Sequence, residues 1–306
     1  MKTKKDFRDG NVLTSGEKAQ NAVINAFMIV LCTITALLFL IVVGSSFQSQ
    51  SEINQVGYRL IPKEFSLEAY ASVFKKPDTI LSAYIVTIVT TLLGAVLGTL
   101  MTAGYAYPLS RKDFRYRKIL SLLNLISMLF NGGMVATYIV MTRWFGLKNN
   151  MWVLILPLIF SPWNVILMKS FFVSIPDSLV EAAKIDGAGE FKIFFRIVIP
   201  VSKPIIATIA LFLTLTCWND YQTSLLYVTN ESLYKLQYLL MKILTDMDFL
   251  NSAAAADIGI NLENVEIPTK NLRMAMCVVA AGPILVVFPF FQKYFTKGIT
   301  LGCVKE

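Results

Sequence analysis

The chain has 306 residues, of which 55% are hydrophobic and only 16% are charged, and it contains no histidine. Soluble domains carry about 25% charged residues, so this composition indicates a protein embedded in lipid. Without histidine, the chain lacks the commonest general acid–base group and the commonest metal ligand. Its four cysteines lie far apart and form neither a metal-binding spacing nor a disulfide framework. These residues are Cys32, Cys217, Cys277 and Cys303.

Six stretches are long and apolar enough to cross a bilayer, for which a helix needs about 20 mostly apolar residues. They cover about residues 22–46, 80–109, 119–141, 151–172, 198–228 and 271–294. The first is too long for a signal peptide and has no small-residue cleavage site, so we expect it to be retained. The last two contain prolines, which membrane helices tolerate where neighbouring groups satisfy the freed carbonyls. The sequence therefore predicts an all-α membrane protein with six transmembrane helices.

The basic residues predict the orientation of these helices. The segment before the first span and the segment between the second and third spans each hold five Lys or Arg residues. The longer loop after the first span holds four, and the loop after the third span holds two. Because basic residues concentrate on the cytoplasmic side, both termini are expected in the cytoplasm. The domains predicted are a cytoplasmic tail over 1–21, a six-helix domain over 22–296 and a cytoplasmic tail over 297–306.

The net charge of +8 is therefore interpreted as a signal of topology. A nucleic-acid partner is not expected, because no basic stripe with stacking aromatic residues occurs on a soluble domain.

The second span carries small residues at helical spacing, namely Gly94, Gly98 and Thr102. Small residues allow helix backbones to approach closely, so we interpret them as helix-packing positions.

The predicted cytoplasmic loop 174–200 contains a short helix, a sharp turn and a second helical segment. Ser178 and Glu181 have the spacing of a capping box, in which each side chain satisfies a free amide at a helix start. Gly187 can adopt the left-handed conformation that ends a helix.

The short helix in this loop has features of a docking surface. Ala182 and Ala183 would let another surface approach closely, and Glu181 and Asp186 would add charged contacts at its rim. A connector that lies against the lipid headgroups explains the same pattern, and both interpretations stay open on these grounds.

The loop resembles the EAA loop of permease subunits of bacterial ABC importers. The matching residues are Glu181-Ala182-Ala183, Gly187 and Ile197-x-Ile199-Pro200, where the family pattern has Leu at the position of Ile199. The resemblance extends from the first span to the C-terminus and is closest to the carbohydrate-uptake permeases. These include the maltose permease's smaller subunit and the LplC/YtcP-type subunits. Supporting stretches are Asn131-Gly132-Gly133, Trp218-Asn219-Asp220-Tyr221 and residues 290–295.

This resemblance implies a type I ABC importer (MetI-like) permease fold in a bacterial cell membrane. The loop helix would be a coupling helix on a cytoplasmic ATPase dimer, with Glu181, Ala182, Ala183 and Gly187 carried over and Asp186 added as a rim contact. It also implies a second, non-identical permease subunit and an extracytoplasmic sugar-binding protein as partners. The substrate would be a carbohydrate, more an oligosaccharide than a monosaccharide.

The chain lacks the G-x-x-x-x-G-K-[ST] phosphate loop. It is therefore not expected to be an enzyme or to hold a cofactor, and ATP and Mg²⁺ are expected on the partner ATPase. An alternative is an ion-coupled secondary transporter of a small polar solute. That transporter would need buried carboxylates or inverted repeats, and the spans offer few carboxylates. An integral membrane enzyme is a further alternative, but the chain has neither a histidine nor clustered acidic residues to supply its chemistry.

Polar and aromatic residues within spans are candidates for the translocation path, because exposing polar groups to lipid is costly. A sugar presents hydroxyls to amides and C–H faces to aromatic rings. The candidates are Asn131, Trp163, Asn164, Trp218, Asn219 and Tyr221. Structural packing is the competing interpretation for each, because amides also bond between helices and tryptophan is enriched at membrane interfaces.

Two further features lie toward the predicted outer side. Asp220 is 20 residues beyond Pro200, or about 30 Å along a helix, which places it near the outer interface. It is a better candidate for the outer mouth or a binding-protein contact than for a proton relay.

The outer loop 229–270 is long, and loops of this length are often functional. We expect it to be partly helical around 252–259, and the resemblance implies that it docks the binding protein; an ordered cap without a partner is the alternative.

Overall fold

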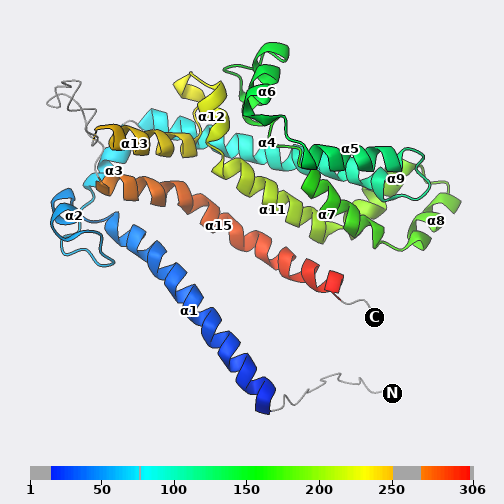
Figure 1. The fold of residues 1–306 in the computed structure, drawn as a ribbon, viewed down its shortest axis with the longest axis horizontal. Coiled ribbons are helices and arrows are strands. Elements are labelled where there is room, and N and C mark those ends of the chain that lie inside the picture. Colours follow the sequence, from blue (N-terminus) through cyan, green and yellow to red (C-terminus); the bar gives the residue numbers. More distant parts are fainter. Residues whose placement is uncertain (1–14, 76, 251–269, 304–306) are drawn as a thin grey trace.

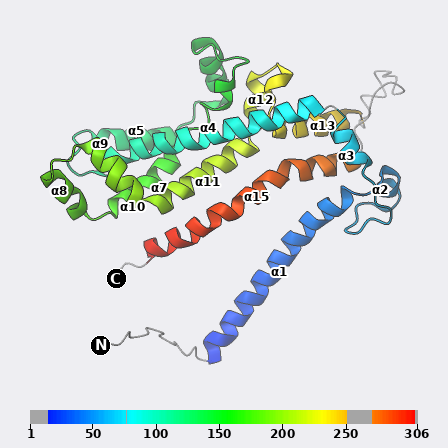
Figure 2. The same ribbon diagram turned by 180° about the vertical axis from the view of Figure 1, so that it is seen from behind.

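The computed structural model describes residues 15–75, 77–250 and 270–303, and these ranges contain helices and no β-strand. Figures 1 and 2 show an elongated bundle in which α4 (Pro77–Ser110) and α11 (Lys203–Asn219) run side by side. Helix α15 (Lys270–Cys303) packs beside α11, and α1 (Ser15–Ser45) lies at the edge of the molecule. The all-α fold predicted from the sequence is confirmed.

The tight pairing of α4 with α11 depends on two glycines. A Cβ atom added at Gly94 would lie 2.7 Å from the sulfur of Cys217, and one at Gly98 would lie 2.8 Å from both Leu213 Cδ1 and the carbonyl oxygen of Ile159. No side chain fits at these distances, so the backbones approach because the side chains are absent. The prediction that these glycines serve helix packing is confirmed.

Helix α1 contrasts with this core. Its apolar part, Gln20–Ser45, is strongly apolar, and none of its most apolar 18-residue stretch is buried within the chain. Beyond it, the short helices α2 (Gln50–Val56) and α3 (Glu68–Val73) form a cap that packs on the start of α15. The side chain of Asn271 joins this cap by donating to the carbonyl of Gln48, at 3.4 Å.

Three helices within the described residues are long and apolar enough to cross a membrane alone. They are Gln20–Ser45, Pro77–Ser110 and Lys270–Val287, and two bent helix pairs raise the number to five if each pair is one span. The last of these helices, α15, continues through Pro283 and Pro289.

The first bent pair falls in the predicted third span, 119–141. Helix α5 (Arg117–Leu129) is followed by α6 (Gly133–Ile139) and the π-helical turn η1 (Val140–Trp144), at an angle of 114°. Gly133 has φ 82°, a left-handed conformation that glycine adopts without strain. The helix therefore breaks at Gly132-Gly133.

The second bent pair precedes α11. Helix α9 (Glu190–Ile193), the π-helical turn η3 (Phe194–Val198) and α10 (Ile199–Val201) lead into α11 at an angle of 83°. Pro204 stands in the first turn of α11, where its missing N–H is not needed.

The predicted fourth span, 151–172, is not one continuous helix. It consists of the 3-10 turn η2 (Met151–Leu154) and, after an irregular segment, α7 (Pro162–Val173). Pro157 lies in the irregular segment, and Pro162 starts α7 because proline favours the first helical turn. With 12 residues, α7 is about 18 Å long, shorter than a bilayer core.

The end of the molecule opposite α8 is built from short helices after α11. These are α12 (Gln222–Tyr227), the 3-10 turn η4 (Glu231–Leu233) and α13 (Leu236–Leu250). Helix α13 lies within the predicted outer loop 229–270, whereas the helix expected around 252–259 lies outside the described residues. Most of the predicted N-terminal tail also lies outside them, and α15 reaches Cys303, beyond the predicted start of the C-terminal tail at 297.

Candidate functional site

The first candidate site is the helix α8 (Asp177–Ile185), which lies at one end of the bundle (Figure 1). The helix begins directly after Pro176, and no side chain caps its first turn. Ser178 therefore lies inside the helix rather than at its cap position, and the predicted capping box with Glu181 is wrong. Asp177 instead places a negative charge in the first turn, where it interacts favourably with the helix dipole.

The end of α8 follows the prediction. Gly187 has φ 76°, the N–H of Gly187 donates to the carbonyl of Lys184 at 3.0 Å, and the N–H of Ala188 donates to that of Ala183 at 2.9 Å. These two bonds form a Schellman motif, which satisfies the last carbonyls of the helix. The turn after α8 is therefore fixed by backbone geometry that glycine permits.

One face of α8 is buried and the opposite face is open. Val180 and Ala183 pack into the core that α4, α7 and α11 share. On the other side, Ile185 is 87% exposed, and Phe191 of the neighbouring α9 is 84% exposed. We call the exposed residues the α8 surface: Leu179, Glu181, Ala182, Ile185, Asp186, Gly187 and Phe191.

The α8 surface contains four of the five residues predicted to couple to an ATPase. Glu181, Ala182, Asp186 and Gly187 are exposed there. Ala183 points into the chain's own core, where its small side chain lets α8 lie close to the bundle.

Salt bridges tie α8 to the segment between α4 and α5. Lys184 Nζ lies 2.9 Å from Asp113 Oδ2 and 2.8 Å from Glu190 Oε1, and Lys112 Nζ lies 3.0 Å from Asp177 Oδ2. The hydrogen bond from Lys184 lowers the pKa of Asp113, and the bonds to Glu190 and Asp113 raise the pKa of Lys184. These side chains are partly exposed, so solvent screens the attraction.

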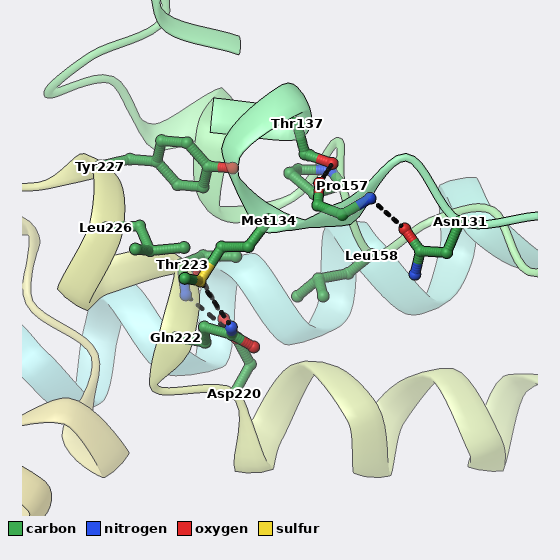
Figure 3. A pocket seen from close by; sticks show the side chains of 11 residues that line it. Asn131, Met134, Thr137, Pro157, Leu158, Asp220, Gln222, Thr223, Leu226 and Tyr227 are labelled. Atoms are coloured by element: carbon green, nitrogen blue, oxygen red, sulfur yellow. Dashed lines mark hydrogen bonds between the residues drawn. The ribbon is translucent and has the colours of Figure 1, made fainter. Parts of the chain in front are cut away.

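The second candidate site is a pocket where two helix breaks meet (Figure 3). One break separates α5 from α6, and the other separates α11 from α12. The pocket has a volume of about 340 Å³. Its lining residues are Asn131, Gly133, Met134, Thr137, Pro157, Leu158, Asp220, Gln222, Thr223, Leu226 and Tyr227. We call it the outer pocket, since it lies at the end of α11 farther from α8.

The outer pocket presents several polar groups. Asn131 Oδ1 accepts a hydrogen bond from the N–H of Gly133 at 2.9 Å, and Gln222 Nε2 contacts the sulfur of Met134 at 3.5 Å. Tyr227 is only 2% exposed, yet its hydroxyl has no hydrogen-bond partner within the described part of the chain. Its ring stacks on Tyr138, with 5.6 Å between ring centroids, and its hydroxyl points toward the pocket.

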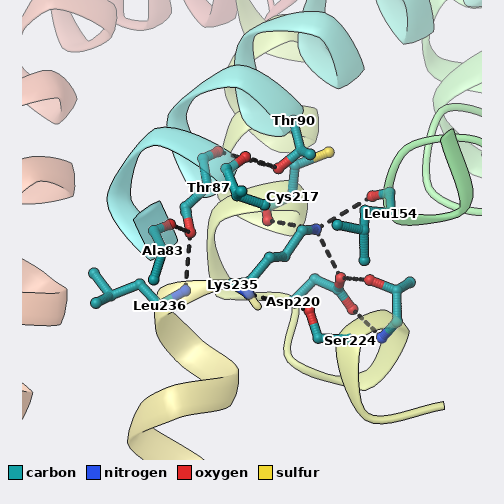
Figure 4. Close-up of polar contacts among 11 residues, drawn as sticks. Ala83, Thr87, Thr90, Leu154, Cys217, Asp220, Ser224, Lys235 and Leu236 are labelled. Carbon is teal, nitrogen blue, oxygen red and sulfur yellow. Dashed lines mark hydrogen bonds and ion pairs between the residues drawn. The ribbon is translucent and has the colours of Figure 1, made fainter. Parts of the chain in front are cut away.

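Behind the pocket lies a buried salt bridge (Figure 4). Lys235 is fully buried and Asp220 is 7% exposed, and Lys235 Nζ donates to Asp220 Oδ2 at 2.8 Å. The same ammonium donates to the carbonyls of Leu154 and Cys217, at 3.2 and 3.4 Å. Thr223 also donates to Asp220 through its N–H and its hydroxyl.

This salt bridge joins several elements. The carbonyl of Cys217 lies in the last turn of α11, where a cation interacts favourably with the helix dipole. Next to Lys235, the N–H of Leu236 donates to Thr87 Oγ1 of α4 at 2.9 Å. Lys235 therefore holds η2, α11 and the start of α13 together.

Two points about this pair differ from the sequence interpretation. Asp220 follows α11 and lines the outer pocket, but one of its carboxylate oxygens, Oδ2, is held by Lys235 and Thr223. Lys235 lies in the predicted outer loop 229–270, and nothing in the local sequence marks it as a buried residue. Its burial depends on tertiary packing that no local pattern of residues reveals.

The six residues predicted to line the translocation path lie in different surroundings in the structure. Asn131 lines the outer pocket, whereas Trp218 is buried and its indole N–H donates to the carbonyl of Ala280 on α15, at 3.1 Å. Asn164 is buried on α7, and three candidates are exposed near breaks or helix ends: Trp163, Asn219 and Tyr221.

Comparisons with known proteins agree with this architecture. Residues 91–301 match the family described as "Binding-protein-dependent transport system inner membrane component". The chain is 40% identical over 274 residues to Protein LplC of Bacillus subtilis, covering 89% of the chain and 90% of LplC. It is 39% identical to the polygalacturonan/rhamnogalacturonan transport system permease protein YtcP of the same organism, covering 92% and 96%.

A solved structure is also similar. It is a bacterial ABC transporter involved in the import of the acidic polysaccharide alginate, with a TM-score of 0.77 and 26% sequence identity. The similarity covers 92% of this chain and 98% of the matched chain. The fold is thus shared with a known transporter, and the chain belongs to the family of binding-protein-dependent transport system inner membrane components.

Proposed function

We propose that the chain is a permease subunit of an ATP-driven, binding-protein-dependent carbohydrate importer. It would form half of the translocation pathway together with a second, non-identical permease subunit. The names of its relatives support a carbohydrate: YtcP is a polygalacturonan/rhamnogalacturonan permease, and AraQ of Bacillus subtilis, 28% identical, is an arabinooligosaccharides permease. These names favour an oligosaccharide over a monosaccharide.

The α8 surface is the observation that carries the coupling role. Ile185 and Phe191 expose most of their apolar area beside the charged Glu181 and Asp186. An exposed apolar patch with a polar rim is typical of a protein interface. A cytoplasmic ATPase dimer that carries ATP and Mg²⁺ is the partner that this surface fits.

Coupling would follow from how α8 is held. Val180 and Ala183 anchor it in the core, and Lys184 ties it to Asp113. A displacement of α8 would therefore move the bundle with it as a nearly rigid body. ATP binding in the partner would bias two arrangements of the subunits, as a ligand does when it binds one state better. Both termini would lie in the cytoplasm, and loop 229–270 would face the sugar-binding protein.

An uptake experiment tests the overall function. The tagged chain is purified with its associated subunits from native membranes, placed in proteoliposomes with the binding protein, and supplied with labelled oligosaccharides. We expect uptake that stops with vanadate and survives collapse of the ion gradients. Uptake that survives vanadate and stops with the gradient would instead support an ion-coupled secondary transporter.

A substitution on the α8 surface tests the coupling role. Ile185→Asp places a charge in the proposed interface, and we expect it to abolish co-purification of the ATPase while the permease remains in the membrane. Ile61→Asp is the matched control, because Ile61 is 76% exposed but lies between α2 and α3, far from α8. Normal ATPase association in Ile185→Asp would refute the docking surface.

A further inference from the structure

We propose that the outer pocket is a binding subsite for one uncharged sugar unit of the transported oligosaccharide. This inference rests on the proposed function and specifies where, and in what charge state, the substrate contacts this subunit. It concerns a site at the end of α11 farther from α8, formed by the two helix breaks.

The size and shape of the pocket fit a small part of an oligosaccharide. Its volume of about 340 Å³ lies near the lower end of the range of small-molecule sites. It lies among α6, α12 and the segment of Pro157 and Leu158, and Asn131 and Gln222 at its lining are exposed. A longer saccharide could therefore place one unit in the pocket while the rest extends outward.

The free hydrogen-bonding groups are those that a sugar requires. The Tyr227 hydroxyl points toward the pocket and has no hydrogen-bond partner among the described residues, so it is free to bond a ligand hydroxyl. Asn131 uses its side-chain oxygen for Gly133, which leaves its amide N–H groups for a ligand. Gln222 keeps its side-chain oxygen available, because its contact with Met134 is made by Nε2.

The charge distribution selects an uncharged unit. Asp220 is the charged residue that lines the pocket, and its balancing cation, Lys235, is fully buried on the far side of the carboxylate. Asp220 Oδ2 is occupied by Lys235 and Thr223, whereas among the described residues Oδ1 accepts only the N–H of Thr223, at 3.2 Å. This oxygen can accept a sugar hydroxyl, but it would repel the carboxylate of a uronic acid.

Tyr227→Phe tests the subsite because it removes the hydroxyl and keeps the ring that stacks on Tyr138. Tyr138→Phe is the matched control, since it makes the same change on the other ring of the stack, outside the pocket lining. The protein is the assembled transporter, purified with its partner subunits and without the binding protein. Saturation-transfer NMR measures binding of the neutral maltotriose, raffinose and arabinotriose and of the anionic trigalacturonate.

We expect at least one neutral trisaccharide to bind, and Tyr227→Phe to weaken it by about threefold to tenfold, the effect of losing one hydrogen bond. Tyr138→Phe should bind like the unmodified protein. Unchanged binding in Tyr227→Phe, binding by trigalacturonate alone, or no binding by any of the four sugars would overturn the proposal.

A cross-linking experiment separates the sugar from a protein occupant. A photoreactive amino acid at Gln222 should capture a radiolabelled neutral sugar in the assembled transporter with its binding protein present. Capture of the binding protein without sugar would overturn the subsite. Carbohydrate uptake by Tyr227→Phe at the unmodified rate and KM would remove the subsite and leave the proposed function standing, whereas absence of any carbohydrate uptake by the unmodified protein would remove the function itself.

Discussion

Two lysines at opposite ends of the bundle form salt bridges under opposite conditions. Lys184 of α8 reaches Asp113 and Glu190 near solvent, with all three side chains partly exposed. Lys235 reaches Asp220 in the interior, where it also satisfies two backbone carbonyls. The distances from the lysine nitrogen to the carboxylate oxygens are 2.8 to 2.9 Å in both places, so the two sets of salt bridges differ in their surroundings and not in their lengths.

The surroundings decide what each pair contributes. An exposed pair gives about 0.2–1 kcal/mol, because water and salt screen the attraction. Removing one partner of a buried pair costs about 3–5 kcal/mol, because the remaining charge is left unpaired in a poorly solvating interior. The salt bridges of Lys184 can therefore break and re-form at a small cost in free energy. Separating Lys235 from Asp220 costs much more, because it leaves a charge unpaired in the interior.

The largest effect is expected at Lys235. Lys235→Met should lower the free energy of unfolding by about 3–5 kcal/mol, since Asp220 would remain buried without its cation. Thermal unfolding of the purified protein in nanodiscs measures this loss. A loss below about 1 kcal/mol would show that the buried pair behaves like the exposed one.

The double variant Lys235→Met with Asp220→Asn sharpens this result. It removes both charges, so it should recover a substantial part of the stability lost in Lys235→Met. Stabilities that simply add in the double variant would contradict an interaction between the two side chains.

An intermediate effect is expected at Gly187. No atom lies within 4 Å of a Cβ built there, so the obstacle to a side chain is its φ of 76°. Gly187→Val should cost about 1–2 kcal/mol locally and reduce ATP-driven uptake, because the turn after α8 would shift while membrane insertion persists. Uptake and ATPase association are measured together.

Gly187→Asn is the matched control for the conformation, because asparagine tolerates the left-handed region. It should retain most of the uptake. Equal loss in the valine and asparagine variants would indicate that the position is sensitive to size rather than to backbone conformation.

The smallest effect is expected at Lys184. Lys184→Ala should lower the free energy of unfolding by less than about 1 kcal/mol. The difference from the unmodified protein should be larger at about 0.01 M than at about 1 M ionic strength, because salt screens exposed pairs. A loss that is insensitive to salt would mean that the α8 contacts are not screened by solvent.

Features that depend on local backbone chemistry were predictable from the sequence. Gly187 ends α8 and Gly133 marks the bend after α5, because glycine alone adopts positive φ without strain. The close approach at Gly94 and Gly98 was also predictable, since small residues on a membrane helix favour packing.

Features that depend on tertiary contacts were not predictable. The spacing of Ser178 and Glu181 fits a capping box, but α8 begins at Asp177, so that box does not form. The outer pocket requires two breaks, more than 85 residues apart in the chain, to meet. Tyr227 and Lys235 acquire their roles only when this meeting buries them, and neither stands out in an apolar or basic pattern.

Helix α1 has a consequence for how the protein is made. It is strongly apolar and unburied, and every backbone bond in its interior can be satisfied within the helix itself. It can therefore insert into the bilayer as soon as it leaves the ribosome, before any later helix exists. The family match covers residues 91–301 and so begins inside α4, after this segment. Helix α1 is in this sense an early anchor, which retains the nascent chain at the membrane while the broken helices of the transport core are still being assembled.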